Sequence, residues 1–413
     1  MRTLLVNEGF RRLWISQIVL ALGDAVMQMG LLELFHRCGY NIQTEIAKML
    51  FAASLPALVF GPLAIAYLDR WQRRNVLMIV DALRAVMIVV IAVWVLPMLT
   101  GHVEGRSLFF VYVMIFAIGT VTTFYYPARY ALLPNLVDTA NLIPANTLFT
   151  TSLAVAGVAG RPLGGFVAER MGVEWAVLAN AVAYLAGVGL IWRITMQPHA
   201  TTQTGTPHPQ GGWGELKVGL VYLWRHPIAM RLTAVTGVFA FLGGVFVVAF
   251  TGYSYDTLKL GTAGLGYLLA SAAPGAAVGV FLMGRAGPWT RSAWLPFVQL
   301  SLAGGLVLLL SATTNPWMAA PLLTVLGGVV ATAMIPIDAK LQEHVDDERR
   351  GAVFAARGMV TSATMIIAFW LQFGCDVFRR TAAPRVLLWL GAGTLAAAFL
   401  TFLAIRSDER REG

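Results

Sequence analysis

The first apolar stretch of the chain contains a carboxylate at a depth where membrane-spanning segments rarely have one. The stretch FRRLWISQIVLALGDAVMQMGLLELF, residues 10–35, starts with two arginines and continues as about twenty mostly apolar residues around Asp24. A carboxylate near the bilayer centre costs about 2.5–3.5 kcal/mol even on lenient insertion scales. We therefore expect Asp24 to have a function or a specific polar partner. Gln17 and Gln28 flank it on the same stretch.

Three further charged residues lie deep within apolar stretches of the first half. Asp81 and Arg84 are three positions apart, so they share one helix face, either as a static ion pair or as part of a binding site. Arg161 has no charged neighbour in its own stretch, which leaves a structural partner and an anionic ligand both open. As a ligand it would favour carboxylate, catecholate or phosphate oxygens, which guanidinium binds in bidentate fashion. Asn146 opens the same stretch and either binds substrate or bridges helices.

Asp24 is the candidate residue for proton binding. In the alternative, Asp24 has only a structural role and forms hydrogen bonds within the protein. Burial disfavours a charged carboxylate and a nearby cation favours it. A conformational change that moves an arginine would therefore switch its protonation. The candidate residues for substrate binding or proton coupling are Asp24, Gln28, Asp81, Arg84, Arg161 and Asn146.

The elements that must position these residues are membrane-spanning helices. The chain is 58% hydrophobic and only 12% charged, whereas a soluble domain carries about 25% charged residues. Its mean hydropathy is +0.70. Apolar runs of about 20 residues, long enough to span a bilayer as helices, occur at 12–34, 46–68, 75–97, 107–128, 142–169, 173–194, 229–251, 262–284, 291–312, 316–338, 350–374 and 384–405. We therefore predict an all-α integral membrane protein with twelve transmembrane helices.

Charge placement predicts the orientation of these helices. An even number of spans places both termini on one side, and most Lys and Arg residues fall in the segments on that side. The positive-inside rule assigns it to the cytoplasm. The formal charge of +9 then reflects topology and affinity for an anionic leaflet, so nucleic-acid binding is not needed to explain it. The first span is too long, and too polar at Asp24, for a cleaved signal peptide.

The longest polar gap divides the spans into six plus six. Residues 196–228 begin as a Thr/Pro/Gly-rich linker and end in an amphipathic helix from Trp213 to Trp224. We expect an N-terminal bundle at 1–195 and a C-terminal bundle at 229–413. A faint repeat relates the two halves: YYPARYALLPNLVD follows span 4 and MIPIDAKLQEHVD follows span 10. Such pseudo-symmetric six-helix halves are typical of transporters that alternate access around a midplane site.

Small-residue runs and aromatic residues complete the expected helix surfaces. The runs GVAGRPLGG (157–165) and SAAPGAAVG (271–279) predict close helix packing. Phe124, Tyr125 and Tyr126 are expected in an interfacial aromatic belt.

Several stretches together resemble the major facilitator superfamily, in particular its branch of enterobactin-exporter-like and macrolide-efflux-like proteins. FRRLWISQIVLALGD is similar to the first-helix signature of that branch, and YLDRWQRRNVL (67–77) to the superfamily loop between spans 2 and 3. YYPARYALLPNLVDTANLIPANTL and LQEHVDDERRGAVFAARGM resemble the branch's loops after spans 4 and 10. Bacterial inner-membrane lysophospholipid transporters share the Gly-Asp of span 1 and the Pro-Ala-Lys/Arg-Tyr element. The resemblance covers nearly the whole chain.

The resemblance implies a major facilitator fold, a bacterial inner-membrane location, a monomer and a conformational latch at the cytoplasmic side. The expected gating residues are Asp69, Arg70, Arg73 and Arg74, with anchoring of the topology as the alternative, and Arg357, whose position in span 11 also fits a snorkelling arginine. Two motifs depart from the family pattern. Gln72 replaces a glycine in the signature loop, and Arg161 replaces the proline of the antiporter motif in span 5, which weakens the inference of proton antiport from that motif.

We predict a proton-coupled exporter of an amphipathic anionic molecule, siderophore-like or drug-like, that works by alternating access. One alternative is a lysophospholipid transporter, and another is a non-transporting membrane receptor or assembly platform. No cofactor is expected, because the sequence contains no P-loop, metal-ligand spacing or nucleophile–base constellation. We therefore expect no enzyme activity and an ion gradient as the driving force. Cys38 and Cys375 fall near outer helix ends and are expected to be separate thiols, with a disulfide as the alternative.

Overall fold

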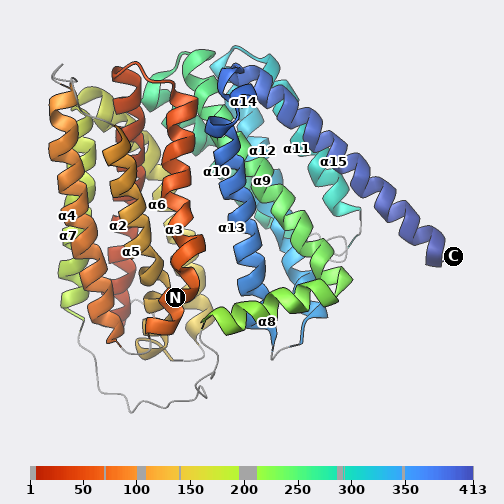
Figure 1. Cartoon of the computed structure of the whole chain (residues 1–413), viewed down its shortest axis with the longest axis horizontal. Helices are drawn as coiled ribbons and strands as arrows, with labels where there is room; N and C mark the ends of the chain where they lie inside the picture. Colours follow the sequence, from red (N-terminus) through yellow and green to blue (C-terminus); the bar gives the residue numbers. More distant parts are fainter. Residues whose placement is uncertain are drawn as a thin grey trace. The chain divides into compact units, whose positions relative to one another are not determined.

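The twelve predicted spans are all helices. The computed structural model describes residues 6–68, 71–99, 108–138, 141–194, 212–285, 292, 294–346 and 349–412, and every regular element within these ranges is helical. The twelve long helices (Figure 1) are α2 (Glu8–Arg37), α3 (Ile42–Leu68), α4 (Arg73–Leu99), α5 (Leu108–Leu132), α6 (Leu142–Arg170), α7 (Val173–Trp192), α9 (Pro227–Asp256), α10 (Gly261–Arg285), α11 (Leu295–Ala312), α12 (Pro316–His344), α13 (Arg350–Gly374) and α15 (Ala383–Glu412). Shorter helices are η1 (Leu133–Asn135), α8 (Gly212–Arg225) and α14 (Asp376–Arg380). The all-α prediction is therefore confirmed.

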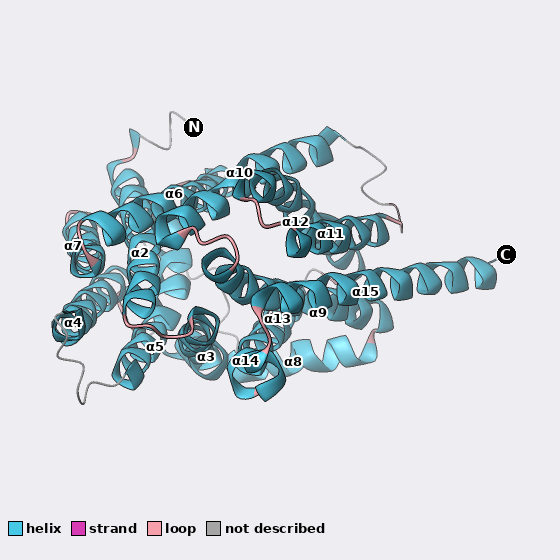
Figure 2. Cartoon of the chain, turned by 90° about the horizontal axis from the view of Figure 1, so that it is seen from above, coloured by secondary structure: helices cyan, strands magenta, loops and turns pink. Residues whose placement is uncertain are grey.

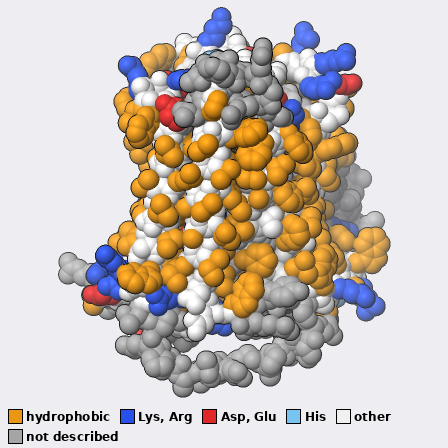
Figure 3. Space-filling view, turned by 60° about the vertical axis from the view of Figure 1, so that its left-hand side comes forward, with side chains coloured by type: hydrophobic (Ala, Val, Ile, Leu, Met, Phe, Trp, Pro, Cys, Tyr) orange, Lys and Arg blue, Asp and Glu red, His pale blue; other side chains and the backbone are white. Residues whose placement is uncertain are grey.

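Length and composition suit a membrane for nearly all of these helices. In the described part of the chain, eleven helices are long and apolar enough to span a bilayer. The twelfth long helix, α6, has 29 residues but is less apolar because it contains several glycines and threonines together with Asn146 and Arg161. The face in Figure 3 has a broad band of hydrophobic side chains with charged side chains above and below it. On α4, Ile79, Val86 and Val93 are among the exposed apolar residues. Exposed Val and Ile in such a band indicate contact with lipid.

The described chain divides into two compact units, each treated by itself. The first unit comprises residues 1–40 and 49–217, and within it α2 packs on α6 and α7 while α4 packs on α5 and α7. Figure 2 shows α4 and α7 end-on beside each other. The second unit comprises 41–48 and 218–413, and its closest helix pairs are α10 with α12, α11 with α15, and α9 with α13.

Glycines set how closely α2 approaches its neighbours, and so where Asp24 points. A Cβ added at Gly160 of α6 would lie 2.6 Å from the Cβ of Ala25, and one at Gly164 would lie 2.6 Å from the Cα of Val26. On α2 itself, a Cβ at Gly23 would lie 2.6 Å from the Asn180 Oδ1 of α7. The run 157–165 therefore packs helices together, as its small residues predict. In the second unit, Gly275 of α10 lies against the backbone of Thr324 in α12.

The amphipathic segment predicted at Trp213–Trp224 is helix α8. Gly219, Tyr222 and Leu223 are buried, and Gly219 lies against the backbone carbonyl of Ala352 in α13. The Tyr222 hydroxyl donates to the carbonyl of His344 at 3.2 Å. This end of α8 is thus docked on the second unit, while residues 196–211 of the predicted linker lie outside the described residues.

Candidate functional site

A cavity of about 480 Å³ lies inside the first unit, surrounded by α2 to α7. Most of its lining is apolar, and its polar lining residues are Gln17, Asp24, Gln28, Arg84, Thr122, Tyr125, Tyr126, Arg161, Asn180 and Tyr184. Four of the six predicted site residues line it: Asp24, Gln28, Arg84 and Arg161. The cavity therefore brings together charged residues from α2, α4 and α6, which are far apart in the sequence.

Asp24 is exposed within this cavity and has two hydrogen-bond donors from α7. The Tyr184 hydroxyl donates to its Oδ1 at 2.7 Å, and the Asn180 amide donates to the same oxygen at 3.3 Å. Tyr184 and Asn180 are four positions apart and so share one face of α7. The carboxylate is thus held in place from one side and remains open to the cavity on the other.

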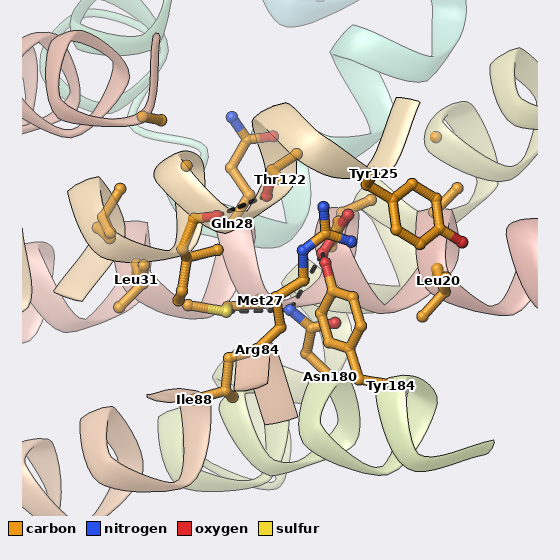
Figure 4. A pocket seen from close by; sticks show the side chains of 18 of the residues that line it. Leu20, Met27, Gln28, Leu31, Arg84, Ile88, Thr122, Tyr125, Asn180 and Tyr184 are labelled. Carbon is orange, nitrogen blue, oxygen red and sulfur yellow. Dashed lines mark hydrogen bonds between the residues drawn. The ribbon is translucent and has the colours of Figure 1, made fainter. Parts of the chain in front are cut away.

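Arg84 lines the same cavity and forms an ion pair with a second carboxylate, Asp81. Its Nη1 lies 3.2 Å from Oδ1 of Asp81, and the two residues are 3% and 0% exposed. The guanidinium carbon lies 4.6 Å from the ring centroid of Tyr125 and 5.3 Å from that of Tyr184, within cation–π range. Figure 4 shows Arg84 beside these two rings. Arg84 and Asp24 line the same cavity, so their opposite charges attract each other. Asp81 does not line the cavity and lies behind Arg84 as its ion-pair partner.

A polar chain runs from Arg84 to the end of α5. The Gln17 amide donates to the Tyr125 hydroxyl, and Arg129 Nη1 donates to Gln17 Oε1 at 3.2 Å. Arg129 is buried and lies 4.6 Å from the ring centroid of Tyr130. Tyr125 is only 3% exposed, so its predicted place in an aromatic belt is wrong. The hydroxyl of Tyr125 needs a buried partner, and Gln17 supplies it.

Arg161 lines the cavity without a carboxylate partner in the described part of the chain. Its Nη1 donates to the Gly157 carbonyl, one turn earlier on α6, at 3.0 Å. This bond leaves most of the five N–H donors of the guanidinium available. Because its charge is not neutralised by an ion pair there, Arg161 is suited to hold an anionic group in the cavity.

Two other predicted groups lie elsewhere. Asn146 donates to the Leu142 carbonyl of its own helix at 3.1 Å and does not line the cavity. In the expected latch, Arg73 donates to the carbonyl of Ala131 at 2.9 Å, and Arg74 donates to that of Trp192. Both therefore tie the start of α4 to neighbouring helix ends. Asp69 and Arg70 lie outside the described residues.

Arg357 has an ion pair in the second unit. On α13, it pairs with Asp338 of α12, and its Nε donates to the Thr236 hydroxyl of α9 at 3.2 Å. It joins three helices within that unit. Both cysteines, Cys38 and Cys375, are free.

Sequence reasoning missed the α7 and α5 partners of the charged residues. Asn180 and Tyr184 stand in VEWAVLANAVAYLAGVGL with an i, i+4 spacing inside an apolar helix, and that spacing was the available signal. Arg129 lies just outside the predicted span 107–128. In the structure, α5 continues through Pro127 to Leu132 and buries Arg129.

Comparisons with known proteins agree with this architecture. The family model described as Major Facilitator Superfamily matches residues 13–369. The chain is 24% identical over 419 residues to the lysophospholipid transporter LplT of Escherichia coli O9:H4 (strain HS), covering 98% of this chain and 97% of that protein. It is 23% identical over 370 residues to the uncharacterized MFS-type transporter YkuC of Bacillus subtilis (strain 168), covering 84% and 80%.

Solved structures share the fold at low sequence identity. A bacterial homologue of the iron transporter ferroportin, in an inward-facing state, matches with a TM-score of 0.71 at 14% identity, covering 95% of this chain and 96% of that one. The nucleoside transporter NupG matches with a TM-score of 0.69 at 14% identity, covering 96% and 98%. These likenesses are evidence for the fold alone.

Proposed function

The chain belongs to the major facilitator superfamily of multi-pass membrane transporters, and on that premise we propose that it carries an amphipathic anionic molecule by secondary active transport. One observation carries the proposal: the cavity of the first unit is mostly apolar, yet Arg161 faces it without a carboxylate partner among the described residues. Such a cavity suits a ligand with an apolar body and one anionic group. Alternating access is the working mode that the family membership suggests.

Asp24 is the proposed proton-coupling residue. It is exposed within the cavity that Arg84 also lines, and it accepts hydrogen bonds from two α7 donors. A change of state that moves Arg84 toward or away from Asp24 would change which protonation state is favoured. Proton binding at Asp24 and anion binding at Arg161 would then be coupled through the same cavity.

A lysophospholipid is the favoured substrate class. Two relatives named lysophospholipid transporters match along 97% of their own length, and a lysophospholipid combines a phosphate with an apolar chain. Export of a siderophore-like or drug-like anion is the second candidate, since the loops after spans 4 and 10 resemble the efflux branch. We place the protein in a bacterial cytoplasmic membrane with both termini in the cytoplasm, because Lys and Arg gather on that side.

Arg161→Gln tests the anion site. In liposomes with an imposed pH gradient, we expect the variant to weaken transport of a lysophospholipid about 10- to 100-fold, as expected when a charge-assisted hydrogen bond is lost. Arg285→Gln is the matched control, because Arg285 is an exposed cation at the end of α10 that packs on Phe281. Equal transport by the two variants would refute the role of Arg161.

Asp24→Asn tests the coupling. We expect the variant to fold and to lose the proton flux that the substrate evokes, whereas Asp376→Asn, an exposed carboxylate on α14, should keep it. Flux is recorded with a pH-sensitive dye inside the liposomes. A lysophospholipid, a catecholate siderophore and a macrolide are compared, so that the ligand evoking flux identifies the substrate class. Retained substrate-evoked proton flux in Asp24→Asn would rule out Asp24 as the proton site. A wild type that transports none of the three would favour a receptor or assembly platform.

A further inference from the structure

The second unit contains its own cavity, and its lining differs from that of the first. This cavity has a volume of about 440 Å³ and is surrounded by α9 to α13 and α15. Its lining is almost entirely aliphatic or aromatic, including Leu242, Phe246, Leu269, Leu326 and Val330. No charged residue is among its described lining residues.

The three hydroxyl groups on the lining are already hydrogen-bonded to their own helices. Thr236 donates to the Leu232 carbonyl at 2.9 Å, Thr361 to the Arg357 carbonyl at 2.9 Å, and Thr394 to the Leu390 carbonyl at 2.7 Å. The nearby Arg357 side chain forms an ion pair with Asp338 and donates a hydrogen bond to the Thr236 hydroxyl.

A polar ligand would therefore lose its hydrogen bonds to water in this cavity and gain few in return. Burying an unpaired polar group is unfavourable, whereas apolar surface gains free energy by covering an apolar ligand. The physical chemistry of the lining thus selects an apolar occupant.

We propose that this cavity holds the single aliphatic chain of a lipid-like substrate, an inference that rests on the proposed function and specifies the ligand further. A volume of about 440 Å³ is in the range of ligand pockets, roughly 300–1,000 Å³, and this lining offers an aliphatic chain continuous apolar contact. The cavity then acts as a length gauge, because methylenes beyond its capacity gain no further burial.

Gly243 on α9 offers a way to shorten the cavity without disturbing its neighbours. It is a lining residue, and a Cβ added there would meet no atom within 4 Å. A side chain at this position would therefore begin in open space on the lining and occupy cavity volume. Gly393 on α15 is the matched control, since it is exposed, lies outside the lining, and a Cβ there also meets no atom within 4 Å.

The experiment measures binding of lysophosphatidylethanolamines of increasing chain length to the purified full chain in amphipol. We expect affinity to rise about fourfold per methylene up to a plateau. In Gly243→Leu, the affinity should reach its plateau at a chain several methylenes shorter, and the longest chains should bind more than tenfold more weakly. Gly243→Ala should give an intermediate profile. Gly393→Leu should behave like the wild type. A profile without chain-length dependence, or one that Gly243→Leu leaves unchanged, would overturn the proposal.

A second measurement uses the wild-type chain alone, so it does not depend on a variant that folds. A lysophospholipid with a diazirine at the chain end should crosslink to α9 between residues 236 and 247 or to α12 between 323 and 334. Crosslinks only outside the described lining residues would exclude the site.

Arg161→Gln separates this inference from the proposed function. It should weaken all chain lengths alike and leave the plateau in place, because it removes an anion contact and no chain contact. If Arg161→Gln acts but Gly243→Leu does not move the plateau, only the chain site fails. If Gly243→Leu moves the plateau but Arg161→Gln has no effect, the anion site is refuted and the chain site is supported.

Discussion

Arg84 is the residue on which the polar network of the first unit depends. It pairs with the buried Asp81, contacts the rings of Tyr125 and Tyr184, and lines the same cavity as Asp24. A guanidinium held between two rings can shift along them without losing all its favourable contacts, which an ammonium group could not do as well. Arg84 is therefore placed to respond to the charge on either carboxylate.

Tyr184→Phe tests the positioning of Asp24. The substitution keeps the ring near Arg84 but removes the 2.7 Å hydrogen bond to Asp24. Because a hydrogen bond to a charged group contributes about 1.5–3 kcal/mol, we expect substrate-evoked proton flux to fall about 10- to 100-fold and the pH of half-maximal flux to shift. Tyr130→Phe, at an exposed tyrosine outside the cavity lining, should change neither quantity. If the pH profile of Tyr184→Phe does not shift, Tyr184 contributes packing and does not position Asp24.

At the scale of elements, the contact of α2 with α6 determines which charges meet in the cavity. The closest approach occurs at Gly160 and Gly164, where α6 has no side chain and α2 presents Ala25 and Val26. These two α2 residues directly follow Asp24, so the glycine contact sets the rotation of α2 and turns the carboxylate toward α7 and the cavity. Arg161, next to Gly160, is held on the cavity lining by the same contact.

Gly164→Val tests this helix contact. The new Cβ would lie 2.6 Å from the Val26 Cα, so the helices must separate, and overpacking of this kind costs about 1–3 kcal/mol. We expect a lower midpoint of thermal unfolding, followed by tryptophan fluorescence in detergent. Gly189→Val on α7 is the control, since a Cβ there meets no atom within 4 Å and should leave the midpoint near wild type. Equal unfolding midpoints for Gly164→Val and Gly189→Val would show that α2 and α6 can separate without loss of stability.

At the scale of the whole molecule, each compact unit contains one of the two cavities described above. The first unit's cavity is lined by Asp24, Arg84 and Arg161, and the second unit's cavity by apolar side chains and hydrogen-bonded threonines. Within its own unit, the first cavity suits an anionic group and the second suits an apolar chain.

Thiol labelling tests the proposed topology. A membrane-impermeant maleimide added outside intact cells should label Cys38 and Cys375, which are expected on the outer side. Gln72 is exposed between α3 and α4. The cysteine of Gln72→Cys should be labelled only in inside-out vesicles. Burial raises the pKa of the Cys38 thiol, so less thiolate is present near neutral pH and its labelling should speed up as the pH rises. Single Cys→Ser variants assign each signal. Outside labelling of Gln72→Cys would reverse the assigned orientation.

The sequence by itself determined the helical membrane architecture and the charged residues available to it. Hydropathy, helix length and the placement of Lys and Arg are properties of local segments, so the twelve helices could be predicted without knowledge of their packing. Only the tertiary structure decided which side of each helix faces a cavity. It placed Asp24 against Tyr184, put Asp81 behind Arg84, and left Asn146 bonded to its own helix. Those contacts depend on the rotation of each helix about its axis, which packing between distant segments fixes and no local pattern encodes.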